Sequence, residues 1–476
     1  MKLLTRKRIW TGIIIILALL FVFVGYFVVS NISTFQLAPI GIGYKAKILC
    51  SGIFVSHREP GSILSEDLSY PPELGIAKTK INYEDRSVTA SVYGLMKREA
   101  VYREGLGCTL LSGLTQAEIL SRSSALPPPL PENPESVPWP TGDKIATSEI
   151  PPNVDRQLLQ QALDKAFSEP DTERLRRTRA VVIVYDGHLV AERYSPGITK
   201  DMPLIGWSMT KSVTSALVGI LVGQGKLSLG EPAPVPEWEE PDDPRHSITL
   251  DHLLRMSSGL KFIEEYEDNP ASDVNIMLFL RPDAAAYAAS MPTEARPDEK
   301  WSYSSGTTNI VSRIIRHTLG NQEDYAAFPR KALFNRIGMR SAIMEMDASG
   351  TYVGSSFMYA TARDWARFGL LYLNDGIWEG QRILPEGWVK YSTTPTPGAP
   401  KGQYGAHFWL NRGDPENPED RPFPQLPTDL FLAWGFQEQQ TVILPSHRLV
   451  VVRLGMTHQG LWGLESFILD VLKAIE

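Results

Sequence analysis

Apolar residues are most concentrated near the start of the chain, in the uncharged run "IWTGIIIILALLFVFVGYFVVS" at residues 9–30. At about 1.5 Å per helical residue, this run can cross a hydrocarbon core of roughly 30 Å. The preceding "MKLLTRKR" is basic, and basic flanks stay in the cytoplasm. Residues 1–35 are therefore predicted to be a cytoplasmic basic tip and a single-pass transmembrane anchor. A cleaved signal peptide is the alternative, although its apolar region would be shorter.

Residues 36–126 are predicted to form a small β-rich domain. Three stretches have the apolar and β-branched content of strands, namely "AKILCSGIFVS", "RSVTASVYGLM" and "GLGCTLL". Seven prolines then occur between Pro127 and Pro140. Proline fixes φ and cannot donate to a β-ladder, so residues 127–145 are predicted to be an extended linker that runs over the surface.

Residues 146–476 are predicted to form one large α+β domain. Helical spacing in "VDRQLLQQALDKAFSE" is followed by two expected strands in "AVVIVYDGHLVAERYS", joined by a turn at Asp186-Gly187. A nearly uncharged helix is expected in "WSMTKSVTSALVGILVGQGKL". Strands return in "QQTVILP" and "RLVVVRLGM", and "LESFILDVLKAIE" closes the chain as a helix. The pattern predicts an antiparallel sheet flanked by N- and C-terminal helices, with a helical region inserted between its halves.

Composition and charge narrow the function classes. The 476 residues are 43% hydrophobic and 21% charged, which is typical of folded globular domains. The net charge of -7 offers no basic face for phosphates, so nucleic acid is not an expected partner. The sequence has no zinc-ligand spacing and no phosphate-binding glycine loop, so neither a metal nor an organic cofactor is expected.

The two cysteines, Cys50 and Cys108, both fall in the predicted small domain. Outside the cytoplasm, an isolated pair of this kind favours a disulfide over a metal site or catalytic thiols. Two buried free thiols are the alternative.

The first candidate chemistry is the serine and lysine of "WSMTK", where Ser208 stands three residues before Lys211. On a helix these positions are neighbours, and a buried neutral lysine can take the proton of a serine hydroxyl. A second Ser-x-x-Lys, at Ser258 and Lys261, shows that the motif arises easily, but Gly259 predicts a turn there. Alternatively, Ser208 is only an N-cap and Lys211 a solvated residue.

The second candidate is Tyr303-Ser304-Ser305, about 95 residues further on in "WSYSSGTTNIVSRIIRHTLG". The tyrosine stands in a polar turn just before an amphipathic helix. Its phenol could pass a proton to and from a nucleophile if nearby cations lowered its pKa. Alone, the tyrosine would be read as an exposed turn residue.

Five blocks together resemble the serine β-lactamase-like superfamily, in the expected order and spacing. The blocks are "WSMTKSVTSALVGILVGQGKLSL", "ITLDHLLRMSSGL", "KWSYSSGTTNIVSRII", "GSSFMYATARDWARFGLLYLNDGIWEGQRILPEGWV" and "GFQEQQTVILPSHRLVVVRLG". The resemblance covers roughly residues 150–476 and leaves the predicted small domain outside. Within the superfamily it is similar to class C β-lactamases, related esterases and, most of all, 6-aminohexanoate-dimer hydrolases, whose second motif is also Tyr-x-Ser.

The resemblance implies a role for each matching residue. Ser208 would be the acylated nucleophile, Lys211 its general base, Tyr303 a proton shuttle, and Ser305 part of the surrounding hydrogen-bond network. The third family motif falls on Ala433-Trp434-Gly435, which makes Trp434 and Gly435 site residues. The backbone N–H groups of Ser208 and Phe436 would form the oxyanion hole.

This sequence departs from the β-lactam-processing pattern at Ala433, because a cation there would hold a substrate carboxylate and alanine cannot. Trp434 offers an apolar wall instead. The departure favours an ester or amide substrate that lacks this carboxylate.

Other candidates are weaker. Tyr266, in the acidic run "FIEEYEDNPASD", is a possible substrate contact by resemblance, although such a run is usually a solvated loop. His407 could line the pocket, but a structural role is favoured. A Ser-His-Asp triad is not expected, because no Gly-x-Ser-x-Gly elbow surrounds Ser208.

These observations predict a serine hydrolase that forms an acyl-enzyme from a small-molecule ester or amide, such as a nylon-oligomer-like amide or a short-chain ester. A β-lactamase or penicillin-binding DD-peptidase is the alternative. A non-catalytic cell-wall-binding protein on the same fold is the rival from another class. The enzyme is expected in the inner membrane, with its N-terminus inside and its catalytic domain in the periplasm.

Overall fold

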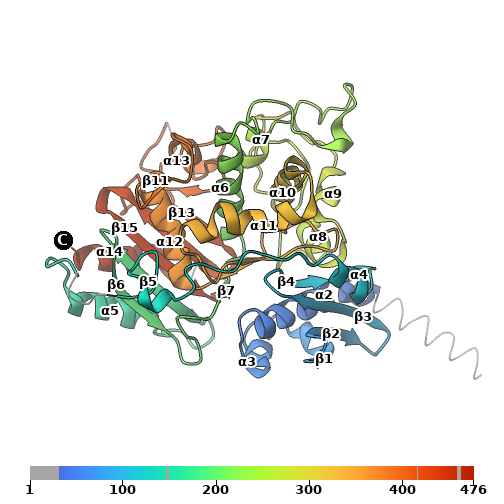
Figure 1. The fold of residues 1–476 in the computed structure, drawn as a ribbon, viewed down its shortest axis with the longest axis horizontal. Helices are drawn as coiled ribbons and strands as arrows, with labels where there is room; N and C mark the ends of the chain where they lie inside the picture. Colours follow the sequence, from blue (N-terminus) through green and yellow to red (C-terminus); the bar gives the residue numbers. More distant parts are fainter. Residues whose placement is uncertain (1–31, 146–149, 415, 458–461, 476) are drawn as a thin grey trace, which may run out of the picture.

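The computed structural model describes residues 32–145, 150–414, 416–457 and 462–475. The run at residues 9–30, predicted to span the membrane, lies outside the described residues. Two bodies are visible in Figure 1, a small N-terminal one and a larger one that carries the main sheet.

The main sheet has six antiparallel strands in the order β12-β13-β14-β15-β5-β6. It therefore joins the first strands of the large domain to its last ones, as the sequence predicted. The turn at Asp186-Gly187 has positive φ at both residues, which suits a tight hairpin. The strands are β5 (Thr178–Tyr185), β6 (His188–Tyr194), β12 (Trp409–Leu410), β13 (Phe431–Gly435), β14 (Gln439–Leu444) and β15 (Leu449–Gly455).

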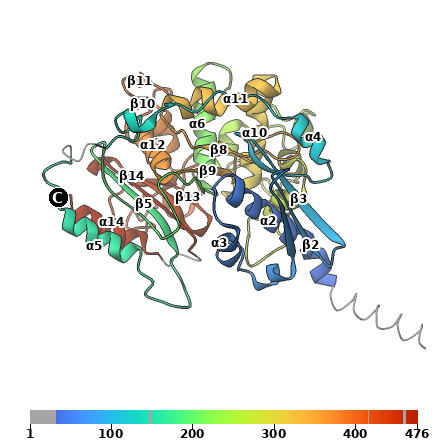
Figure 2. The same ribbon diagram turned by 60° about the horizontal axis from the view of Figure 1, so that its bottom comes forward.

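Helices cover both faces of this sheet. α5 (Arg156–Ala166) and α14 (Leu464–Lys473) pack together on one face, where alternate strand residues such as Val181 and Val451 are buried with them. α6 (Met209–Gly223) and α12 (Ala362–Leu373) lie on the other face, as Figures 1 and 2 show. The predicted antiparallel α+β layout is thus confirmed.

The region between the two halves of the sheet is mainly helical, and α7, α9 and α10 of this region lie at the upper right of Figure 1. Its elements enclose the N-terminal end of α6 and carry most of the candidate site. The helices are α7 (Leu250–Arg255), α8 (Asp273–Leu280), α9 (Ala284–Ala289), α10 (Ser305–Leu319), α11 (Gln322–Ala332) and α13 (Trp388–Ser392). The minor strands are β7 (Leu204–Ile205), β8 (Ile343–Met344), β9 (Met358–Ala360), β10 (Ile377–Trp378) and β11 (Gln381–Arg382).

The small body pairs a four-stranded antiparallel sheet with a long helix. The strands are β1 (Lys78–Asn82), β2 (Ser87–Val92), β3 (Met96–Arg103) and β4 (Gly107–Leu110); the helices are α2 (Ile32–Phe54), α3 (Pro60–Ser65) and α4 (Gln116–Ser121). The strands expected in "RSVTASVYGLM" and "GLGCTLL" are present. A disulfide joins Cys50 on α2 to Cys108 on β4, which confirms the predicted bond.

The strand predicted in "AKILCSGIFVS" was wrong, because that stretch is the second half of α2. The expected boundary between anchor and small domain, after residue 35, also falls inside this helix. The window Leu37–Phe54 is the one in the described part that is long and apolar enough to cross a membrane, yet 72% of it is buried inside the protein. Its apolar residues contact the small sheet and α8, so they form a protein core.

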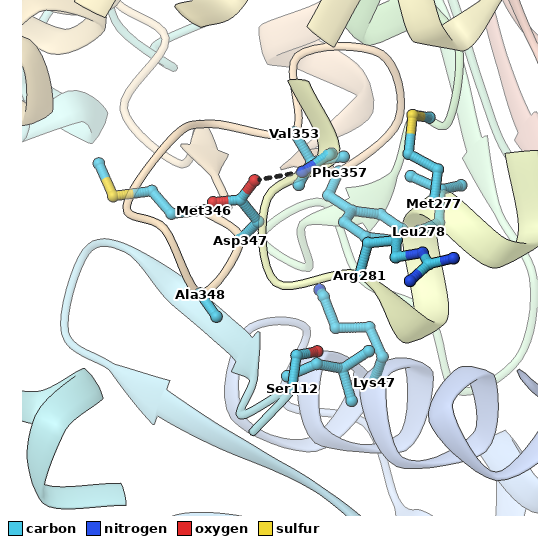
Figure 3. A pocket seen from close by; sticks show the side chains of 12 residues that line it. Lys47, Ser112, Met277, Leu278, Arg281, Met346, Asp347, Ala348, Val353 and Phe357 are labelled. Atoms are coloured by element: carbon cyan, nitrogen blue, oxygen red, sulfur yellow. Dashed lines mark hydrogen bonds between the residues drawn. The ribbon is translucent and has the colours of Figure 1, made fainter. Parts of the chain in front are cut away.

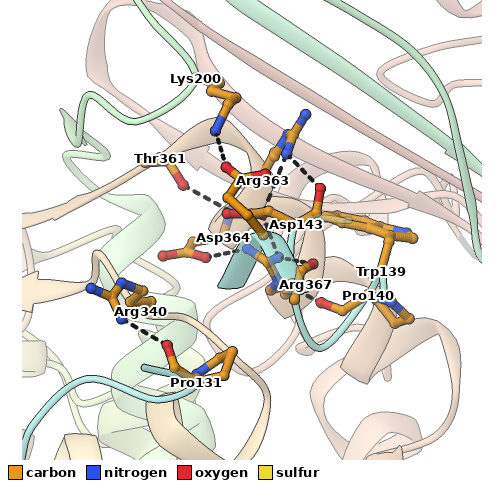
Figure 4. Close-up of polar contacts among 12 residues, drawn as sticks. Pro131, Trp139, Pro140, Asp143, Lys200, Arg340, Thr361, Arg363, Asp364 and Arg367 are labelled. Atoms are coloured by element: carbon orange, nitrogen blue, oxygen red, sulfur yellow. Dashed lines mark hydrogen bonds and ion pairs between the residues drawn. The ribbon is translucent and has the colours of Figure 1, made fainter. Parts of the chain in front are cut away.

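The proline-rich segment is held along its length against the large domain. Arg367 of α12 donates to the carbonyls of Pro140 and Gly142, at 2.6 Å each, and Arg340 donates to Pro131 O at 2.7 Å (Figure 4). The Trp139 indole N–H also donates to Gly187 O, at 2.9 Å. This segment therefore acts as a strap from the small body to the edge of the main sheet.

Candidate active site

The first turn of α6 presents Ser208 and Lys211 side by side. Ser208 occupies the N-cap position, but its backbone is helical (φ -66°) and its side chain makes no capping bond. Its Oγ instead lies 2.9 Å from Lys211 Nζ. Trp207, just before it, has a φ of 47°, a conformation that non-glycine residues rarely adopt and that clusters at functional sites. The geometry favours the nucleophile-and-base interpretation over the helix cap.

Lys211 is almost completely enclosed, with 1% of its surface exposed. Its Nζ also donates to Ser305 Oγ, at 2.9 Å, and to the carbonyl oxygen of Ser355, at 3.1 Å. Burial lowers the pKa of Lys211 to about 8, and the negative charge of Glu264 acts in the opposite direction. A lysine with this pKa is partly neutral near neutral pH, as a general base must be.

Glu264 fixes the orientation of Ser305. The Ser305 hydroxyl lies 2.5 Å from Glu264 Oε1, and the Ser305 backbone N–H donates to Oε2 at 2.7 Å. Burial raises the pKa of Glu264, while the charge of Lys211 and the bonds from Ser305 oppose this. Tyr266 donates its phenol proton to Glu264 Oε1, at 3.2 Å. The acidic loop therefore enters the site instead of being solvated throughout.

In a neutral Lys211 amine, which has two N–H donors and one lone pair, these contacts give each donor and the lone pair a partner. A carbonyl oxygen can only accept, so Ser355 takes one N–H. Ser305 Oγ commits its own proton to the Glu264 carboxylate and must therefore accept the second N–H from Lys211. The lone pair is left for the hydroxyl proton of Ser208, which is the arrangement that a general base requires.

Tyr303 lies beside this pair. Lys211 Nζ is 4.8 Å from the centroid of the Tyr303 ring, and the phenol forms a hydrogen bond with the Ser208 side chain. The condition set for proton transfer by this phenol, a pKa lowered by nearby cations, is not met: burial and the charge of Glu264 raise the pKa of Tyr303 far above its usual value, and the hydrogen bond with Ser208 offsets this only in part. Tyr303 is therefore a neutral phenol that can donate a proton.

The end of β13 lies directly against the start of α6. A Cβ atom on Gly435 would stand 2.2 Å from Gly206 O and 3.1 Å from Ser208 N, so only glycine fits. This close approach brings the backbone at residues 435 and 436 next to the Ser208 N–H. The oxyanion pair of Ser208 and Phe436 stays a prediction that this placement supports.

Aromatic rings lie on two sides of the Ser208 region. On one side, the Phe436 ring stacks on Tyr266 with centroids 5.0 Å apart and meets Trp207 edge-on at 5.7 Å. On the other side, Tyr303 packs on Trp409 at 5.2 Å, and Trp409 meets Trp434 at 5.7 Å.

Ala433 and Trp434 point to opposite faces of the sheet. Ala433 is buried in the core that includes α6, whereas Trp434 is partly exposed and packs toward the core of α5 and α14. Trp434 therefore reaches the site through its neighbour Trp409, and the apolar wall expected from it is made mainly by other rings.

His407 lies behind α6. Its ring nitrogens are 3.0 Å from Lys211 O and 3.1 Å from Thr308 Oγ1, and burial followed by the charge of Lys211 lowers its pKa to about 3. It is thus a neutral residue that supports the α6 backbone.

The other Ser-x-x-Lys motif, at Ser258 and Lys261, is separate from the site. Ser258 Oγ accepts from Leu260 N–H at 3.3 Å, and Lys261 is exposed.

Sequence reasoning missed two groups. Glu264 is one of several acidic residues in the run around Tyr266, and composition alone does not single out one carboxylate among them. The Ser355 carbonyl is a backbone group in "GSSF", which no side-chain pattern can identify. The Tyr-x-Ser motif was the one sequence signal that could have pointed to Glu264. A buried serine that accepts a hydrogen bond from a lysine needs a nearby acceptor for its own hydroxyl proton, and a carboxylate can be that acceptor.

The pKa of Lys211 predicts the pH dependence of acylation. Because only the neutral amine accepts the Ser208 proton, kcat/KM for an ester should rise with pH and level off above an apparent pKa of about 8. Glu264→Gln removes a charge that raises this pKa, so the rising limb should move to lower pH. Rates measured from pH 5 to 10 for both proteins check this. A limb that stays fixed or moves upward in the variant would contradict the assignment.

Comparison with known proteins identifies the family of the chain. A family model described as Beta-lactamase matches residues 163–460. The chain is 26% identical over 274 residues to the 6-aminohexanoate-dimer hydrolase of Paenarthrobacter ureafaciens, a match that covers 52% of this chain and 69% of that protein.

Solved structures are similar at lower identity. A protein of Bacteroides dorei assigned to the beta-lactamases is 16% identical with a TM-score of 0.52, over 67% of this chain and 97% of that one. A class C beta-lactamase of Rhodobacter sphaeroides is 15% identical with a TM-score of 0.48, over 67% of this chain and 99% of that one. The Bacteroides likeness shows a shared fold alone.

The family model spans more than half of the chain, so the chain belongs to the beta-lactamase family. This family and the related hydrolase indicate that the chain is a serine hydrolase.

Proposed function

We propose that this protein is a serine hydrolase that cleaves a neutral ester or amide through an acyl-enzyme on Ser208. The observation that carries the proposal is the set of three acceptors around Lys211 Nζ, namely Ser208 Oγ and Ser305 Oγ at 2.9 Å each and Ser355 O at 3.1 Å. In the neutral amine, Ser305 and Ser355 take the two N–H groups and the lone pair is left for Ser208. A residue kept only for packing would need neither a lowered pKa nor this assignment of donors.

In acylation, Lys211 takes the Ser208 proton while Oγ bonds to the substrate carbonyl carbon. The Ser208 and Phe436 N–H groups hold the resulting oxyanion. As the tetrahedral adduct collapses, the proton passes from the Lys211 ammonium through the Tyr303 phenol to the leaving group, which departs as an alcohol or amine. Water then adds to the acyl group, with the same residues acting in reverse, and frees Ser208.

The surroundings of the site favour an apolar acyl group without a carboxylate. The rings on both sides offer apolar area, and Ala433 has no charge with which to hold an anion. The Glu264 carboxylate, partly exposed beside Ser305, also disfavours an anionic substrate. Short-chain esters and nylon-oligomer-like amides fit these requirements better than penicillins.

Weak β-lactam turnover is the corresponding prediction. A chromogenic cephalosporin should be hydrolysed about 10- to 150-fold less efficiently than a short p-nitrophenyl ester, because the carboxylate loses a charge-assisted hydrogen bond of the kind worth about 1.5–3 kcal/mol. Steady-state kcat/KM for the two substrates at pH 8 provides the comparison. Equal or better efficiency with the cephalosporin would favour the β-lactamase or DD-peptidase alternative.

A series of p-nitrophenyl esters tests the proposal against a non-catalytic, cell-wall-binding role. The serine hydrolase should turn over one or more acyl lengths, with Tyr303→Phe slower by about 10²-fold or more because it removes a proton-transfer group. A pure binder would release no p-nitrophenol above the buffer rate with any member of the series.

We also infer that residues 9–30 anchor the enzyme in the inner membrane, with the N-terminus in the cytoplasm and the catalytic domain in the periplasm. The uncharged run, its basic flank and the disulfide support this location. Protease added to intact spheroplasts should remove the catalytic domain. Protection until the membrane is permeabilised would place the domain in the cytoplasm.

A further inference from the structure

One carboxylate connects the small N-terminal body to the catalytic domain. Glu345, just after β8, is fully buried. Three groups of the small body converge on it: the Lys47 ammonium, the Ser51 hydroxyl at 2.8 Å and the Cys108 backbone N–H at 2.6 Å. Gly107 allows this approach, because a Cβ there would meet the Glu345 carboxylate at 2.4 Å.

Glu345 also holds both arms of the loop that follows it. Its backbone N–H donates to Phe357 O at 2.8 Å, and its carbonyl accepts from Val353 N–H at 2.9 Å. Between these two bonds lies Ser355, whose carbonyl accepts a proton from Lys211. The loop at residues 346–357 therefore joins the small body to Lys211 through a chain of hydrogen bonds.

A second contact runs in parallel. Lys47 Nζ lies over the Phe357 ring, 4.2 Å from its centroid, and Phe357 in turn packs on Trp207 at 6.1 Å. Figure 3 shows the cavity at this junction, with Lys47 and Ser112 of the small body facing Met346, Asp347, Val353 and Phe357. Lys47 thus touches both the carboxylate that holds the loop and the ring beside the strained Trp207.

We propose that the small N-terminal body is part of the catalytic apparatus, with Lys47 and Glu345 as positioning residues for Lys211. Their ion pair holds the 346–357 loop so that the Ser355 carbonyl receives one N–H of the neutral amine, which directs the lone pair to Ser208. The Cys50–Cys108 disulfide ties together α2 and β4, the two elements that grip Glu345. The inference rests on the proposed function and extends it to Lys47 and the small body, which the family model does not cover.

Lys47→Met in the purified full-length protein tests this proposal. It keeps most of the apolar stem and leaves the Glu345 carboxylate without its cation. The rate of labelling by a fluorophosphonate probe should fall by about tenfold or more, because a displaced base is costly, and the pH of half-maximal labelling should shift. KM for a short ester should stay within about twofold, since Lys47 is remote from the acyl group.

Arg179→Met is the matched control. Arg179 also joins the large domain to the small body, through a buried pair with Asp67 at 2.6 Å, but it makes no contact with the 346–357 loop among the described residues. It should lower the melting temperature as Lys47→Met does, while leaving the labelling rate within about twofold. Lys47→Met with Glu345→Gln should recover part of the labelling rate, because the glutamine Oε1 still accepts from Ser51 and Cys108.

The outcomes separate this inference from the function on which it rests. Labelling of Lys47→Met at the wild-type rate, or an equal loss in Arg179→Met, overturns the positioning role. If Ser208→Ala is still labelled, the proposed function itself fails. Loss of labelling in Ser208→Ala, together with slow labelling confined to the Lys47 variant, supports both.

Discussion

Replacing Ser208 by alanine should abolish covalent labelling by a fluorophosphonate probe and reduce ester hydrolysis to the background rate. In the proposed mechanism the Ser208 hydroxyl oxygen forms the bond to the probe, and Lys211 Nζ, the proposed base, lies 2.9 Å from it. The fold should survive, because Ser208 makes no capping bond to the helix. Labelling followed by in-gel fluorescence, with melting temperature as a check, measures the effect.

Ser258→Ala is the matched control for this experiment. Ser258 belongs to the other Ser-x-x-Lys motif, is also buried, and its hydroxyl bonds only to a turn N–H among the described residues. Its variant should label at the wild-type rate. Labelling that persisted in Ser208→Ala and disappeared in Ser258→Ala would place the nucleophile at the second motif.

Lys211→Met should lower the rate of acylation by about 10²- to 10⁴-fold, the range expected for losing a general base. Methionine fills the space of the aliphatic stem but cannot accept the Ser208 proton, and it leaves Ser305 and Ser355 without their donor. The remaining rate should also lose the rise centred near pH 8, because no amine titrates in the site. Stopped-flow measurement of p-nitrophenol release at several pH values tests both effects.

Lys261→Met provides the comparison, since this lysine is exposed and has no part in the site. Its pH profile and rate should match those of the wild type. A Lys211→Met enzyme that kept the rising limb would assign the titration to another group.

The sequence was most informative where chemistry and local structure coincide. Ser208 and Lys211 are three residues apart on one helix, so their contact followed from helical geometry once α6 was predicted. The antiparallel sheet followed from strands at both ends of the domain. Tyr303 and Ser305 depended on the resemblance, because about 95 residues of intervening chain carry no distance information.

Groups that depend on tertiary placement could not be predicted. Glu264 becomes important because its loop folds over α10 and meets Ser305, and its neighbours in the acidic run have the same residue type. The Ser355 carbonyl has no side-chain signature at all. The raised pKa of Tyr303 likewise comes from enclosure by Tyr404 and Trp409, which lie about a hundred residues away along the chain.

The failure of the strand prediction for "AKILCSGIFVS" has a physical explanation. α2 is buried against the small sheet on one side and α8 on the other, so its apolar residues show no clear helical period. Lys45 and Lys47 stand two positions apart, which imitates strand alternation. Both are buried, however: Lys45 donates to the carbonyls of Leu74 and Ala77, at 2.8 and 2.7 Å, and Lys47 pairs with Glu345. Charged residues usually indicate an exposed face, but these two lysines are buried because they bind partners that are distant in sequence.

The integration of the small body changes how the domain boundary should be viewed. The family model begins at residue 163, but the groups that brace the loop behind Lys211 come from α2 and β4. A catalytic domain produced without residues 32–126 would expose the buried Glu345 and lose its three partners. Experiments on activity therefore require the full chain.

Intact-protein mass spectrometry after incubation with a short ester, a linear amide and a penicillin tests the central claim most directly. The account predicts a mass increase equal to one acyl group with the ester or the amide, located on the peptide that contains Ser208, and little or no adduct with the penicillin. The absence of any adduct under rapid acid quench, or an adduct on a residue other than Ser208, would contradict it.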